Sequence, residues 1–421
     1  MTHHSDSKVL ISISSWIVYL LPLSLLTGPF LSDLSIVIIN IIFVYFVVKR
    51  KEWKYLKNKF TYFFSIFYLY LLLSSFLSEN IILSLESSLF YFRFFVFSLA
   101  VWLLIEKNKK FLKTFTYIFI IIFIFVIIDG YVQFIFGSPI LYPATVTNNR
   151  LMLSFNEKLV LGNYVSRLFP LLFGLILYKF SETKSSLLFL MLLLISSCLL
   201  VYLSGERTAA GLMIISTVLL IVMISKYKLV RIFTFLVTLV FVILITFSSG
   251  EIKKRMIDTT LDQMNFNSPQ YRIIIFSPEH DSIYRSSINM FLSNPLIGVG
   301  PKNFRIFCDD KKYKVNDRGC STHSHNNYIQ SLAETGLIGF SFLVFIVLYI
   351  FREVFFNIKS MLNGKQRTSD FQVCLLICFI LTLFPVLPTL SLFNNWINII
   401  YYLPVGFYLY EINSNKYKSN S

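Results

Sequence analysis

The sequence predicts an all-α protein that crosses a lipid bilayer many times. Its 421 residues are 56% hydrophobic and only 14% charged, whereas an ordinary soluble domain carries about 25% charged residues. Apolar runs of about twenty residues recur along the chain, and each is long enough to cross a bilayer as a helix. The composition therefore argues against a string of soluble domains, and lipid is the expected solvent for most of the surface.

Twelve apolar segments are candidate membrane spans because each joins aliphatic and aromatic residues with few charges. They lie at residues 9–27, 33–48, 60–78, 87–105, 114–137, 158–178, 186–203, 208–225, 232–248, 336–351, 371–387 and 395–411. The chain is accordingly expected to have three parts. Residues 1–248 hold spans one to nine, residues 249–335 form a hydrophilic loop domain, and residues 336–421 hold spans ten to twelve and a tail.

The basic residues predict the orientation of these spans. If the first eight residues are cytoplasmic, the loops on that side hold 22 of the 38 Lys and Arg residues, and the short loops on the other side hold three. This asymmetry is the positive-inside signature, so both termini are expected in the cytoplasm. The first segment is expected to be a retained span, because neither a preceding basic run nor a small-residue cleavage site marks it as a signal peptide.

The same parity places the hydrophilic stretch 249–335 on the outer face, where it holds 11 further Lys and Arg residues. Long segments are translocated largely regardless of charge, so these cations need another explanation, such as an anionic ligand. We expect no nucleic-acid partner, because most of the basic excess follows the membrane topology. No phosphate-binding glycine loop, zinc-spaced Cys/His set or serine nucleophile elbow occurs in the sequence, and no metal or cofactor is expected.

Two cysteines share the predicted outer loop. In an oxidising compartment Cys308 and Cys320 are expected to form a disulfide, which would close a short loop and contribute about 2–3 kcal/mol. Two reduced thiols are the alternative.

Two arginines lie inside predicted spans, where an ionisable side chain is costly unless it faces a cavity or a partner. Arg93 sits about two turns below the outer end of its span, and Arg167 lies near the middle of another. Each is a candidate for a functional role. The alternative, that each holds helices together through backbone carbonyls or a buried acid, is equally well supported by the sequence.

A charged turn is predicted at the outer face between spans seven and eight. Glu206 and Arg207 follow Ser204 and Gly205 there, and Arg207 would lie at the start of the next helix, where the helix dipole favours an anion. Because a guanidinium matches phosphate oxygens bidentately, Arg207 is a candidate phosphate ligand.

The outer loop brings a tight turn at residues 294–305, which includes Gly298 and Gly300. Glycines allow a backbone to approach a ligand closely, and the turn also carries Lys302 and Arg305. We expect this turn to contribute to an outer-face binding site.

Histidines follow the turn in the sequence. His323, His325 and Asn326 precede the tenth predicted span, and a stretch with helical potential before the turn carries His280 and Arg285. A histidine at the membrane entrance of a helix is a plausible general base near neutral pH. A purely structural histidine is the alternative, although the arginines and the glycine turn in the same region favour the functional interpretation.

The motif around His325 resembles that of the O-antigen ligase and polymerase superfamily of bacterial envelope enzymes. That family has a His followed by Asn, Ser or Gln, then nine residues, then Gly-x-x-Gly. Here His325-Asn326, nine intervening residues and Gly336-Leu337-Ile338-Gly339 match it without a gap. The motifs cover about residues 204–340, and the earlier part of the chain matches only in its predicted topology.

The resemblance implies a GT-C type membrane glycosyltransferase of the bacterial inner membrane that works at the periplasmic face. Its donor would be a glycan on polyprenyl (undecaprenyl) diphosphate, used without a nucleotide sugar, metal or cofactor and with inversion at the anomeric carbon. His325 matches the histidine that activates the acceptor hydroxyl, and Arg207 matches an arginine that binds the donor diphosphate. Where the family often has a second arginine, this chain has His280, so Arg285 or Arg305 is expected to supply the missing charge.

Three functions remain open at this point. A ligase would join a finished glycan to lipid A-core in lipopolysaccharide biosynthesis, whereas a polymerase would use the same donor to extend a surface polysaccharide. A flippase for a lipid-linked glycan would need polar groups such as Arg93, Arg167 and Arg207 along the whole membrane depth, ideally within two related halves. Because the polar residues concentrate on one face, the sequence favours an enzyme.

Overall fold

The computed structural model describes residues 2–141, 150–152, 159–180, 183–224, 226–266, 274, 277–365 and 367–419. These residues form helices and contain no strand, which confirms the predicted all-α class. A helix overlaps each of the twelve predicted segments. These helices are α1 (Thr2–Ser24), α2 (Pro29–Lys49), α3 (Lys59–Phe76), α4 (Ile81–Ser88) with α5 (Phe92–Lys107), α6 (Phe111–Phe136), α7 (Leu161–Phe180), α8 (Lys184–Leu203), α9 (Arg207–Met223), α10 (Lys228–Ser248), α15 (Asn327–Leu362), α16 (Asp370–Thr382) and α17 (Asn395–Ser419).

Shorter helices fill the segment between α10 and α15. They are α11 (Gly250–Lys253), a π-helical turn η2 (Lys254–Asp258), α12 (Thr259–Gln263), α13 (Pro278–Ser293) and α14 (Phe304–Phe307), and a 3₁₀ turn η1 (Trp53–Tyr55) precedes α3. The hydrophilic stretch is thus helical where it is described. Its status as a separate domain stays a prediction.

Nine segments of the described chain are helical, long and apolar enough to cross a membrane, and α4 and α5 together make one of them. Helices α9 and α16 are apolar but shorter. These features agree with a polytopic membrane protein, whereas the count of twelve spans stays a prediction. Helix α16 ends at Thr382, before its predicted end. Pro385 and Pro388 follow it, and a proline has no N–H to donate to the carbonyl four residues earlier.

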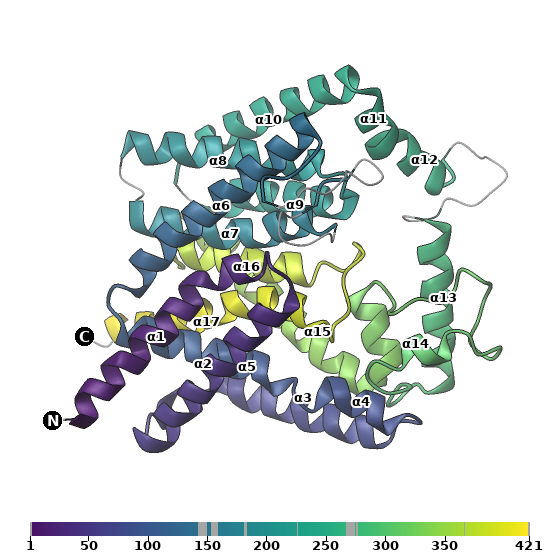
Figure 1. Cartoon of the computed structure of the whole chain (residues 1–421), viewed down its shortest axis with the longest axis horizontal. Helices are drawn as coiled ribbons and strands as arrows, with labels where there is room; N and C mark the ends of the chain where they lie inside the picture. Colours follow the sequence, from purple (N-terminus) through teal and green to yellow (C-terminus); the bar gives the residue numbers. More distant parts are fainter. Residues whose placement is uncertain are drawn as a thin grey trace.

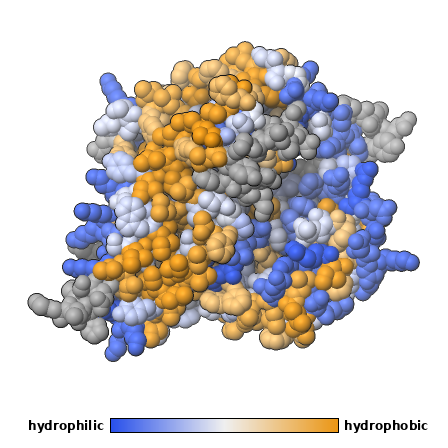
Figure 2. Space-filling view, viewed as in Figure 1, coloured by the Kyte–Doolittle hydropathy of each residue, from blue (hydrophilic) through white to orange (hydrophobic). Residues whose placement is uncertain are grey.

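Most of the long helices run roughly across the view in Figure 1, and both chain ends lie on the side opposite α13 and α14. Hydrophobic side chains dominate the middle of this face, and hydrophilic ones gather along its two margins (Figure 2). An apolar middle between polar ends is what a protein spanning a bilayer requires.

Helix α7 forms the centre of the bundle and packs against α8, α9 and α16. Only glycine fits at position 174 of this helix, because a Cβ there would lie 2.6 Å from the Cβ of Cys374 in α16. This central packing fixes the ends of α8 and α9, and hence the turn that carries Glu206 and Arg207.

Candidate functional site

Three histidines lie together at the α13 side of the molecule. His280 is in the first turn of α13, and His323 and His325 lie in the segment just before α15. The ring centroid of His325 is 4.0 Å from that of His323 and 5.4 Å from that of His280. Across the described ranges, no group of three or more His, Cys, Asp or Glu side chains is arranged to hold a metal ion.

Local backbone geometry sets the position of His325. Its φ is 52°, in the left-handed region that residues other than glycine rarely adopt. The next residue, Asn326, is the N-cap of α15, and its Oδ1 accepts hydrogen bonds from the amides of Tyr328 (2.9 Å) and Ile329 (3.2 Å). The ring of His325 lies 3.1 Å from Ser321, measured from Nε2 to Oγ. The His-Asn pair of the motif therefore turns the chain into the helix and leaves the imidazole beside its start.

The connection between α16 and α17, residues 383–394, holds this histidine segment from the other side. The amide of Thr389 donates to the carbonyl of His325 at 2.8 Å, and its own carbonyl lies 3.2 Å from Nε2 of His323. Asn326 Nδ2 donates to the carbonyl of Pro385 at 2.8 Å. We missed this support in the sequence because backbone groups make much of it and leave no residue signature.

The site lowers the basicity of all three imidazoles. Burial lowers the pKa of His325 to about 3, and the neighbouring His323 and His280 act in the same direction. Burial likewise lowers the pKa of His323 to about 4, although its bond to the Thr389 carbonyl opposes this and the charge of Arg305 assists it. An ordinary histidine value of about 6.5, as the sequence suggested, does not hold, and His325 is neutral at neutral pH.

The glycine turn packs onto α15 instead of facing a ligand. Helix α15 is kinked at Gly336 (φ 61°), and the buried carbonyls of Ala333 and Glu334 accept hydrogen bonds from the amides of Val299 (2.9 Å) and Gly300 (3.0 Å). The amides of Val299 and Gly300 are therefore occupied by α15, and our expectation that the amides of this turn approach a ligand is wrong for these two residues. The Gly336 kink instead frees carbonyls that hold the turn beside the motif.

Close packing explains why glycine is needed at the kink. A Cβ on Gly336 would lie 2.3 Å from the carbonyl oxygen of Leu296, and one on Gly298 would lie 2.5 Å from the carbonyl carbon of Glu334. Both positions also have a positive φ, so substitution at either would be strained.

Glu206 and Arg207 lie at the turn between α8 and α9, as predicted. The Glu206 carboxylate accepts hydrogen bonds from the Gly162 amide (2.7 Å) and the Asn163 side chain (2.8 Å) at the start of α7. Burial raises the pKa of Glu206 to about 7 despite these bonds. Its carboxylate therefore supports the start of α7 and forms no ion pair with Arg207 in the structure.

Arg207 is half-buried and its guanidinium faces α12. Its Nη1 lies 3.2 Å from Thr260 Oγ1, and its Nη2 lies 2.6 Å from Gln263 Oε1. Burial lowers the pKa of His280, and the positive charge of Arg207 lowers it further, whereas Glu279 opposes both effects. Arg207 is thus within electrostatic reach of His280, whose ring is next to that of His325.

The remaining predicted cations of this region have different surroundings. Arg305 is exposed but close enough to His323 to influence its pKa. Arg285 is exposed and forms an ion pair with Asp281 in its own helix (Nε–Oδ2, 3.0 Å). Lys302 pairs with Glu86 of α4 (Nζ–Oε2, 2.9 Å). Of these three residues, only Arg305 is linked to the histidine cluster.

The two arginines within spans hold neighbouring helices together. Arg93 forms an ion pair with Asp33 of α2, its Nη2 lying 3.2 Å from Oδ1. Arg167 donates to the carbonyl of Leu381 at 3.0 Å and lies over the ring of Tyr401. Both contacts are of the structural kind that the sequence left open.

Cys308 and Cys320 form a disulfide, with their Cα atoms 4.8 Å apart. Ser321, which contacts the ring of His325, directly follows Cys320. The disulfide therefore ties the histidine segment to α14.

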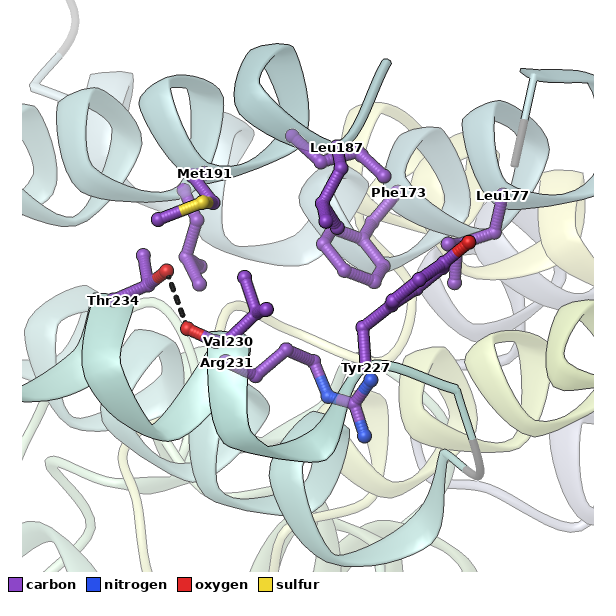
Figure 3. Close-up of a pocket in the computed structure, with 10 residues that line it drawn as sticks. Phe173, Leu177, Leu187, Met191, Tyr227, Val230, Arg231 and Thr234 are labelled. Atoms are coloured by element: carbon purple, nitrogen blue, oxygen red, sulfur yellow. Dashed lines mark hydrogen bonds between the residues drawn. The ribbon is translucent and has the colours of Figure 1, made fainter. Parts of the chain in front are cut away.

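An open cleft of ≈ 270 Å³ adjoins the Glu206–Arg207 turn, and Gly205 and Arg255 are among the residues that line it. A second, apolar pocket lies between α7, α8 and α10 (Figure 3). In that pocket, the guanidinium of Arg231 donates to the Ile224 carbonyl at 2.7 Å. Arg231 lies in the first turn of α10, and the loop segment follows the other end of that helix, about 25 Å away along its axis. The apolar pocket is therefore remote from the histidines.

Comparison with known families adds independent information. Residues 189–344 match the family model described as O-antigen ligase. The match covers less than half of the chain and shows a likeness to O-antigen ligases over this segment. It runs from α8 into the part of α15 beyond the kink and includes Arg207, the histidine cluster and both glycine motifs. A search of curated proteins finds no match to the chain.

The O-antigen ligase match supports the resemblance found in the sequence and agrees with the many apolar helices. Members of this superfamily are membrane ligases and polymerases of the glycosyltransferase type, and their substrates are lipid-linked glycans. The match ends at residue 344, so Thr389 and the rest of the supporting connection lie outside it.

Proposed function

We propose that this protein is an O-antigen ligase-like glycosyltransferase. It moves a glycan from polyprenyl diphosphate to a sugar hydroxyl of lipid A-core at the periplasmic face of the bacterial inner membrane. The observation that carries this proposal is the position of His325, which is neutral, partly exposed and linked through His280 to Arg207. A base and a phosphate-binding cation are the two groups that this reaction requires.

The chemistry follows from these two groups. The acceptor hydroxyl oxygen attacks the anomeric carbon, the bond from that carbon to the diphosphate oxygen breaks, and the diphosphate leaves with the bonding electrons. His325 takes the proton of the hydroxyl, because its neutral imidazole has a free lone pair. Arg207 stabilises the negative charge that develops on the leaving diphosphate. Attack from the face opposite the diphosphate inverts the anomeric carbon.

A bound donor also adjusts the base. The pKa of His325 is low in the free protein because of burial and neighbouring histidines. A diphosphate placed beside it brings negative charge, which favours the protonated imidazole and raises its pKa. The base therefore becomes stronger when the donor is present.

Transfer by purified protein tests the function. The full-length protein in detergent, given an undecaprenyl-diphosphate glycan and lipid A-core, is expected to release undecaprenyl diphosphate and form a core-linked glycan. If the donor glycan is joined only to another donor glycan and not to lipid A-core, the protein is a polymerase. Absence of any chemical transfer, together with lipid movement across sealed vesicles, would identify a flippase.

His325→Ala tests the proposed base in the same assay. We expect a loss of about 10²–10⁴-fold in kcat, the range in which general base catalysis usually contributes, with the protein still present in the membrane. Arg285→Ala is the matched control, because this exposed arginine pairs within its own helix. Near-normal transfer by His325→Ala would remove His325 as the base.

A further inference from the structure

Three guanidinium groups converge at the turn between α8 and α9. The pKa of Arg255, which lies in η2, is lowered by burial first and then by the positive charges of Arg207 and Arg150. Arg255 Nε donates to the carbonyl of Gly205 at 3.3 Å. Within the described ranges, none of the three arginines forms an ion pair with a carboxylate, and the buried Nε of Arg150 has no acceptor. The buried Glu206 carboxylate offsets part of the charge of Arg150, and the remaining positive charge favours an anionic ligand.

Arg255 also lines the open cleft of ≈ 270 Å³. The cleft lies between the ends of α6 and α8 and the segment that begins α11. Its apolar surface includes Phe134, Leu203, Ile252 and Met256, and Arg255 is the one cation among its lining residues. The cleft therefore combines a surface for a hydrocarbon chain with a group for an anion.

The surroundings of Arg255 follow a definite order. Arg255 lines the apolar cleft and donates a hydrogen bond to the carbonyl of Gly205, two residues before Arg207, and the ring of His280 is next to that of His325. The positive charge of Arg207 acts on both Arg255 and His280. A polyprenyl-diphosphate glycan has the same order of parts, namely a hydrocarbon chain, two phosphates and a sugar.

On the basis of the proposed function, we propose that the cleft binds the phosphate-proximal isoprene units of the donor and that Arg255, together with Arg207, binds its diphosphate. Arg255 takes the role for which the sequence offered Arg285 or Arg305. Glu251 also lines the cleft, one helical turn before Arg255. Its carboxylate repels the diphosphate and limits how tightly the spent carrier is held.

Binding of carrier lipid to the full-length protein in detergent tests the arginine. Arg255→Gln should weaken the binding of undecaprenyl diphosphate by about tenfold or more, as expected when a charged hydrogen bond is lost. Glu251→Gln should tighten the binding of undecaprenyl diphosphate, because a negative charge next to the diphosphate is removed. Lys254→Gln is the matched control, because it removes an exposed positive charge next to Arg255 that does not line the cleft, and it should change affinity by less than about twofold. Equal effects of Arg255→Gln and Lys254→Gln would overturn the assignment.

Chain length tests the cleft independently, including the case in which Arg255→Gln fails to fold. Met256→Trp should fill the cleft and weaken the binding of undecaprenyl diphosphate. Geranyl diphosphate and inorganic pyrophosphate should bind to this variant as tightly as to the wild type. An equal loss for all three ligands would show that the hydrocarbon chain lies elsewhere. Pyrophosphate binding as tight as that of the lipid would show a site for free phosphate only.

The same variants separate this inference from the proposed function. Wild-type protein that binds the carrier as described but transfers no glycan would leave the site standing and remove the enzymatic function. If the wild-type protein transfers glycan and the donor KM of Arg255→Gln is unchanged, the function stands and Arg255 is not part of the donor site.

Discussion

The imidazole of His325 has a different environment from the one that its sequence motif alone suggests. The motif could identify the residue, because His325, Asn326 and Gly336 are close in sequence and belong to one helix start. Its low pKa could not be foreseen, because it depends on burial and on His280, a residue from another helix. Arg255 could be suspected only as part of a basic run after the ninth span, and its coupling to Arg150 requires the fold.

These residue-level effects predict an unusual pH profile. Because the pKa of His325 is about 3 in the free protein, kcat/KM should not fall as the pH drops through the ordinary histidine range near ~6.5. His280→Ala should raise the pKa of His325 by removing both burial and positive charge, and so move the acid limb to higher pH. His280→Phe, which keeps the burial, should move it less. Glu206 has a pKa of about 7 and would titrate in the same range, so the test uses a Glu206→Gln background. An acid limb of kcat/KM near ~6.5 in that background would contradict this account of the site.

At the scale of elements, a kinked helix and an irregular connection form the support of the site. The nine residues between His325-Asn326 and Gly336 are the first turns of α15, and the kink at their end provides the carbonyls that hold the glycine turn. The spacing in the motif is therefore the length of this helical piece. The connection 383–394 was predicted partly as a span, although its prolines end α16 early.

The contact between Thr389 and His325 gives a test at this scale. Thr389→Pro removes the amide that donates to the His325 carbonyl, and we expect kcat to fall by about 10–100-fold, the equivalent of one lost buried hydrogen bond. Thr389→Ala keeps that amide and loses only the 2.9 Å bond from Oγ1 to Asn327 Oδ1, so its kcat should fall much less. Donor KM should change little in either variant. Equal losses in both would show that the backbone contact does not position the base.

At the scale of the whole molecule, the apolar middle and polar margins of Figure 2 match the predicted arrangement in a bilayer. The chain ends lie opposite α13 and α14 (Figure 1), so one polar margin carries the termini and the other carries the histidine cluster. Hydrophobic composition and charge asymmetry could predict this much, because they act over whole segments. They could not place the cleft beside Arg207, since it is formed by helices far apart in sequence.

The central claim is that donor diphosphate and base meet at this margin. An experimental structure of the protein with a bound undecaprenyl-diphosphate glycan tests it most directly. We predict phosphate oxygens within hydrogen-bond distance of Arg207 and Arg255, the hydrocarbon chain in the adjoining cleft, and the first sugar beside His325. A diphosphate bound at the remote pocket near Arg231, or a first sugar out of reach of His325, would contradict the account.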